Sequence, residues 1–236
     1  MAGTLSPRLL ANAPHRLMFF VGASNLLLGM LWWTAWLVAA RWQMFAMPQP
    51  SPYAGWLHAY VMQYQMLPSF IFGFLLTVFP KWTGQPDIAR SRYLPVGIGL
   101  FGGQIATLLG ALGWPHGVAL GVLLTLFGWL AGLSALAPLL WRETGTTWHA
   151  RSCLAALVMG FAGLLAWTAF VLGGSPLWMF ASIKIGSFGF LLPVYFTVAH
   201  RMFPFFAASA VPGYQAWRPM WVLAMFWPLV LLHLGL

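Results

Sequence analysis

Hydrophobic positions along this chain form long runs that short polar segments separate. A run of about 20 apolar residues is the length that an α-helix needs to cross the hydrocarbon core of a bilayer. A helix also pairs its own backbone polar groups inside lipid. The pattern therefore predicts an all-α polytopic membrane helix bundle, a single domain over residues 1–236. Its seven predicted spans lie near residues 17–40, 57–79, 93–113, 118–141, 152–172, 177–200 and 220–236.

Charged residues are rare in this chain, and almost all of them are basic. Eleven Lys and Arg residues stand against two acids, Asp87 and Glu143, and charged residues make up 6% of the chain. Mechanisms that need paired carboxylates, such as glycoside hydrolysis, therefore lack their residues. A single cysteine, Cys153, excludes an intramolecular disulfide and any zinc or iron–sulfur site built from several cysteines. Histidine is left as the main candidate for metal binding.

The basic residues gather on one side of the predicted membrane. When the connecting segments are assigned to alternate sides, the other side receives only Arg41, and Lys184 falls within a span. Because cytoplasmic loops carry the excess of Lys and Arg, the amino terminus is predicted to be cytoplasmic. The net charge of +9 then reflects topology and contact with the lipid bilayer, and we expect no nucleic-acid partner. The cytoplasmic set is Arg8, Arg16, Lys81, Arg90, Arg92, Arg142, Arg151, Arg201 and Arg218.

Three histidines, His58, His200 and His233, lie in or at the ends of predicted spans, where ionisable groups usually face the bundle interior or an aqueous cavity. His58 and His233 both belong to the outer half of the membrane. Two imidazoles that face each other across a bundle can hold a haem iron, and neutral imidazole also suits copper. In the alternative interpretation, each ring only bonds a neighbouring carbonyl or water. The other histidines, His15, His116 and His149, fall in loops or at interfaces.

Further side chains around the spans add to this hypothesis. A helical stripe is predicted for His58, Met62 and Met66, which are spaced four residues apart. Their nitrogen and sulfur donors suit copper. In the alternative interpretation, the methionines only fill gaps in packing. Lys184 either reaches the outer interface or pairs with an anionic cofactor group such as a haem propionate. Arg201, beside His200 at the cytoplasmic face, can hold a lipid phosphate or a propionate.

Proline and glycine predict where helices bend and where they approach closely. Pro68 and Pro193 each free a carbonyl one turn earlier, so bends are expected at Tyr64 and Gly189. The third and fourth spans carry two small-residue motifs that favour close packing of helices. These motifs are Gly99-x-x-x-Gly103 and Gly117-x-x-x-Gly121.

Three segments, at residues 57–60, 73–86 and 200–206, resemble the NnrS family of bacterial inner-membrane proteins. Members of that family carry a Trp-His-Ala-His-Glu-Met-like segment before a GFLLT motif and a tryptophan-threonine-glycine turn. The resemblance places His58 on the first family histidine, with Tyr60 at the position of the second and Val61 in place of the glutamate. The matching segments are Leu57-His-Ala-Tyr60 with Gly73-Phe-Leu-Leu-Thr-Val-Phe-Pro-Lys-Trp-Thr-Gly-Gln-Pro86, and His200-Arg-Met-Phe-Pro-Phe-Phe206.

The resemblance implies a multi-pass protein of the bacterial inner membrane that contains haem b and copper. It further implies a role in nitric oxide metabolism or resistance to nitrosative stress, with His58 and His200 as the ligands that carry over. His233 does not lie in a segment that matches a family motif. Family members usually have about twice as many spans, so we expect a shortened member or a fragment.

Two other classes of function are compatible with the residues. In a passive transporter or channel, Lys184 and the proline-broken spans would line a path, while the absence of carboxylates within the spans argues against proton or sodium coupling. The second alternative is that the chain is a non-catalytic subunit of a respiratory membrane complex. The expected partners are accordingly nitric oxide, a respiratory protein or a second copy of the chain.

Overall fold

The computed structural model describes residues 7–236, in which every regular element is a helix. Six helical segments are long and apolar enough to cross a membrane, and one shorter apolar helix follows them. The prediction of an all-α polytopic bundle is therefore confirmed. The helices are α1 (Pro7–Leu10), α2 (Pro14–Trp42), α3 (Ala54–Tyr60), α4 (Leu67–Thr83), α5 (Arg90–Ala111), α6 (Gly117–Trp141), α7 (Trp148–Val171), α8 (Pro176–Lys184), α9 (Leu192–Ala210) and α10 (Met220–Gly235), with π-helices η1 (Val61–Met66) and η2 (Ile185–Leu191).

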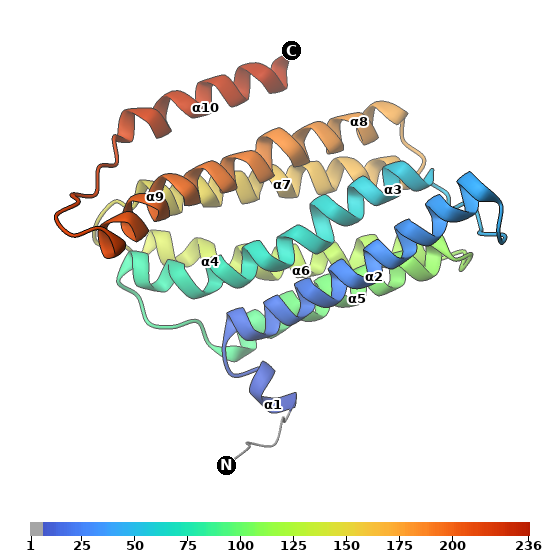
Figure 1. Ribbon diagram of the computed structural model, residues 1–236, viewed down its shortest axis with the longest axis horizontal. Helices are drawn as coiled ribbons and strands as arrows, with labels where there is room; N and C mark the ends of the chain where they lie inside the picture. The colour runs from blue at the N-terminus through green and yellow to red at the C-terminus, as the bar shows by residue number, and fades with distance from the viewer. Residues whose placement is uncertain (1–6) are drawn as a thin grey trace.

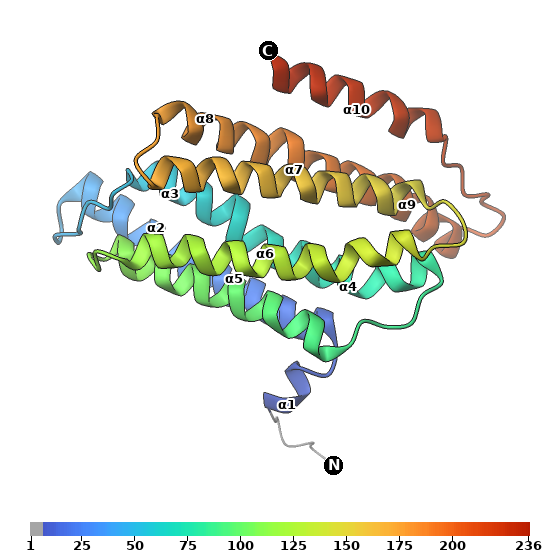
Figure 2. The ribbon, with the colours of Figure 1, turned by 180° about the vertical axis from the view of Figure 1, so that it is seen from behind.

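The helices form two packed groups (Figure 1). The first contains α2, α4, α5 and α6, and the second contains α7 and the continuous helix α8–η2–α9. Contacts of α6 with α7 and of η1 with η2 join the two groups. The last helix, α10, lies along the outside of the second group, where it packs on η2 and α9 (Figure 2). The core between the groups is rich in large buried rings, among them Tyr60, Tyr64, Trp129 and Trp167.

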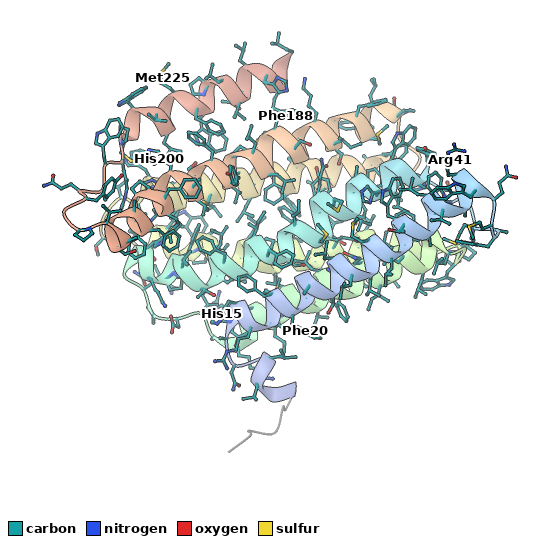
Figure 3. All side chains as sticks on the ribbon, viewed as in Figure 1. His15, Phe20, Arg41, Phe188, His200 and Met225 are labelled. Atoms are coloured by element: carbon teal, nitrogen blue, oxygen red, sulfur yellow. The ribbon has the colours of Figure 1, made fainter. Side chains whose placement is uncertain are left out.

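The two ends of the bundle differ in charge, as the sequence predicts. Figure 3 shows Arg41 at one end, with His15 and His200 toward the other. We call the end that carries His200 the inner end, because the positive-inside rule predicts that it is cytoplasmic. The sixth predicted span stops at His200, whereas α9 continues to Ala210. The helix continues through the apolar residues after His200, because Pro204 removes only one helical hydrogen bond.

The predicted bends at Tyr64 and Gly189 appear as π-helical turns. Tyr64 lies in η1 just before Pro68, and Gly189 lies in η2 just before Pro193. Pro68 has no N–H to pair with the carbonyl of Tyr64, so that carbonyl needs another donor in the buried core. The indole of Trp129 supplies it, because its Nε1 donates to Tyr64 O over 2.9 Å. The bend is thus stabilised from a neighbouring helix.

Replacing Trp129 with phenylalanine is expected to lower the free energy of unfolding by about 1–3 kcal/mol, because it leaves the Tyr64 carbonyl buried without a donor. Thermal unfolding of the purified protein in detergent, followed by circular dichroism, would measure the change. Trp141→Phe is the matched control, since Trp141 is 82% exposed and its ring is not part of the core. Equal melting temperatures for the two variants would contradict this account of the bend.

Candidate functional site

His58 lies on α3 near the outer end of the bundle, in a stack of aromatic rings. Its imidazole is parallel to the indole of Trp33, with ring centroids 4.3 Å apart and planes 7° apart. Trp33 in turn stacks on Trp36 at 5.4 Å, so two indoles from α2 fix the plane of the imidazole. The Nδ1 atom of His58 is buried and has no hydrogen-bond partner among the described residues. A buried nitrogen without a partner is a candidate metal ligand.

The methionines of the predicted stripe follow His58, but a π-helical turn changes their spacing. Met62 lies in the first turn of η1 and is half-buried, whereas Met66 ends η1 and is buried. A π-turn bonds i to i+5, so residues four apart no longer align as they do in an α-helix. Met62 therefore stays within one turn of His58, and Met66 is displaced from the stripe. His58 and Met62 together offer one imidazole and one thioether.

His233 lies on α10, which packs on η2 and α9 and not on the helices around His58. Its ring contacts Phe188 of η2, with centroids 4.2 Å apart. The side chain is exposed on the outside of the bundle, although an intramembrane histidine was expected to face the interior. The structure thus does not bring His58 and His233 together as the hypothesis of a shared iron requires.

Lys184 closes α8 immediately before η2 and is half-buried. Both acids of the chain, Asp87 and Glu143, lie in loops between helices. The carboxylate of Glu143 accepts a hydrogen bond from the Thr147 hydroxyl. An anionic partner for Lys184 within the span would therefore have to come from a bound group or from the lipid interface.

At the inner end His200 meets a histidine that the sequence analysis had placed among the interfacial ones. His149 Nε2 and His200 Nδ1 are 2.9 Å apart. The other ring nitrogen of His200, Nε2, lies 3.2 Å from the carbonyl oxygen of Pro219. Because a carbonyl only accepts, Nε2 of neutral His200 carries the proton and Nδ1 accepts from His149. Both nitrogens of His200 are thus engaged within the protein.

Two arginines lie near this imidazole pair. The guanidinium of Arg201 lies 4.5 Å above the ring of Trp82. Arg218, just before α10, has a buried Nε atom without a hydrogen-bond partner. Both arginines lie close enough to His149 to act on it electrostatically. The inner end therefore combines two imidazoles with a concentration of positive charge, which favours anions over cations.

A cluster of uncharged polar side chains lies in the core between these two ends. Gln65 of η1 donates through Nε2 to the hydroxyls of Thr107 and Thr125, each over 2.9 Å. Nearby, Asn25 and Ser69 lie 3.4 Å apart between Nδ2 and Oγ. The sequence signal of this cluster is the presence of Asn and Gln in the middle of long apolar runs, which by itself does not predict that these side chains meet. Such hydrogen bonds hold membrane helices together.

No group of three or more His, Cys, Asp or Glu side chains that could hold a metal is found within residues 7–236. A closed structural zinc site, which needs four such ligands, is therefore not formed by this part of the chain. What the arrangement offers is one imidazole with an unpartnered nitrogen near the outer end and a hydrogen-bonded imidazole pair at the inner end.

Comparison with known proteins gives one match. The model of a protein family described as NnrS protein matches residues 9–236, nearly the whole chain. Neither the curated proteins nor the solved structures contain a match. The geometry of the site thus has to be interpreted from this chain alone.

Proposed function

This chain belongs to the NnrS family, and from that premise we propose that it is a copper-binding protein of the bacterial inner membrane that acts in nitric oxide metabolism or in resistance to nitrosative stress. Family membership supports a membrane protein related to nitric oxide. The single observation that carries the metal proposal is the buried, unpartnered Nδ1 of His58. Leaving that atom unpaired would cost free energy, and a bound metal ion removes the cost.

Copper fits the residues around His58. Imidazole and thioether are donors that copper accepts, and the softness of the thioether favours Cu(I). Trp33 holds the imidazole plane, which fixes the direction of the free nitrogen. Met62 lies one turn along and can supply the sulfur. Copper held by His58 and Met62 would supply a one-electron redox centre that can bind a small ligand such as nitric oxide.

Haem fits the described residues less well. A haem needs an axial ligand beside a space for its ring, and both nitrogens of His200 are already engaged. An apolar groove of about 620 Å³ between α4 and α9 is lined by residues such as Phe74, Val198 and Met202 and by no histidine. We therefore assign copper to His58 and no haem to the described residues. Arg201 is available for a propionate if a haem binds at the inner end.

The proposal predicts that the protein purified from cells supplied with copper and haem precursor retains about one copper ion per chain, because His58 provides a single site. Elemental analysis measures the copper content. Electron paramagnetic resonance of the oxidised sample should show Cu(II) coupled to a nitrogen nucleus. Optical spectra recorded before and after addition of nitric oxide test for haem and for ligand binding. A protein that carries no copper would refute the proposal, with or without a Soret band.

A further inference from the structure

A groove of about 490 Å³ runs between α7 and α10. The groove exists because α10 packs on η2 and α9 and leaves its side toward α7 largely open. Trp227 spans it, since its Nε1 donates to the Ser152 hydroxyl over 2.8 Å. Ala155, Leu223 and Ala224 line the rest of its length, so most of the groove is apolar.

The inner end of the groove is positively charged. Arg151 lines it and lies 5.6 Å from the ring of Trp148, which also lines the groove. Arg218 precedes the lining residue Met220 by two positions, and its Nε is buried without a partner. Arg201 lies near Arg218 and adds to the positive potential. A guanidinium group can donate two hydrogen bonds to phosphate oxygens, so this end of the groove favours binding of an anion.

We propose that the groove between α7 and α10 binds one anionic phospholipid of the cytoplasmic leaflet. Its phosphate would lie between Arg151 and Arg218, and one acyl chain would lie along Ala155, Leu223 and Ala224. The order of the groove, with arginines at the inner end and apolar residues toward the middle of the membrane, is the order of a phospholipid. Basic pockets between membrane helices on the cytoplasmic side bind anionic headgroups in this way. The lipid would also fill the open space between α7 and α10.

Binding of phosphatidylglycerol to the purified full chain, followed by native mass spectrometry in detergent, tests the headgroup. Arg151→Gln and Arg218→Gln should each weaken binding about fivefold, the effect of one basic residue near an anionic lipid surface. Arg90→Gln is the matched control, because Arg90 is an exposed arginine of the same inner end on α5, and it should bind like the wild type. Phosphatidylcholine should bind the wild type more weakly than phosphatidylglycerol.

A second pair of variants tests the acyl chain and leaves every charge in place. Ala224→Phe places a ring in the groove and should weaken phosphatidylglycerol binding, whereas Ala119→Phe, on an exposed position of α6, should not. Soluble glycerol phosphate, which has the headgroup chemistry without the chain, should fail to displace the lipid at equal concentration. Equal binding of the two lipids by the wild type, unchanged binding by Ala224→Phe, or full displacement by glycerol phosphate would overturn the proposal. Because the test measures no metal, its outcome is independent of the copper site.

Discussion

Replacing His58 with alanine is expected to reduce the copper content of the purified protein by about tenfold or more, because even the loss of a group that only orients a metal ligand lowers affinity 10–100-fold. The imidazole is the only nitrogen donor proposed for this site. The fold should survive, since no hydrogen bond to the buried Nδ1 is lost. Copper per chain in wild type and variant, measured after identical supply and purification, gives the result directly.

His233→Ala is the matched control, because it also removes an intramembrane histidine from the outer half but from an exposed position on α10. Its copper content should equal that of the wild type. Trp33→Leu leaves the imidazole in place and removes the ring that fixes its plane, so it should weaken copper binding without abolishing it. The assignment fails if His233→Ala loses the copper while His58→Ala keeps it.

The other large effect is expected at the seam between α5 and α6. A methyl group added at Gly99 would overlap the backbone of Gly128, which cannot move aside as a flexible side chain can. Separating the two helices disrupts their close packing, so Gly99→Ala should destabilise the protein by about 3 kcal/mol, the upper end of the usual range for overpacking. Unfolding by increasing denaturing detergent, followed by circular dichroism, would measure the loss.

Gly102→Ala is the neighbouring control on the same helix. A methyl group at Gly102 meets Leu124 Cδ1 at 3.5 Å, which is an ordinary contact. Alanine also favours the helix over glycine by about 0.8–1 kcal/mol, so this variant should be as stable as the wild type or slightly more stable. If Gly99→Ala and Gly102→Ala unfolded alike, close approach of the two backbones would not be what stabilises the seam.

Much of the fold could be predicted from the sequence, because the constraints that a bilayer imposes on a helix are visible in short segments of the chain. Apolar runs without charges give the helices, and Gly99-x-x-x-Gly103 gives the close packing of α5 with α6. Pro68 predicts the free carbonyl of Tyr64, but not that Trp129, 65 residues away in the sequence, would donate to it. The identity of such a partner depends on how helices rotate against one another, which no single segment specifies.

The candidate site was predictable only in part for the same reason. The sequence singled out His58, yet the pairing of His58 with His233 required α10 to face the interior, and the structure places α10 on the outside. Conversely, His149 lies in the first turn of α7 and His200 lies toward the inner end of α9. Because these spans run in opposite directions, the sequence already places both histidines at one end of the bundle. Their 2.9 Å contact depends on helix rotation as well as on depth.

The π-helical turn η1 determines which neighbouring helices each half of the second span faces. An α-helix advances by about 100° per residue, so the extra residue of a π-turn shifts the facing direction of everything beyond it by about that angle. The half before η1 can therefore present His58 to the indoles of α2, while the residues from Gln65 onward turn toward α5 and α6. One continuous span thereby orients the proposed copper ligand His58 toward α2 and the polar side chain of Gln65 toward α5 and α6.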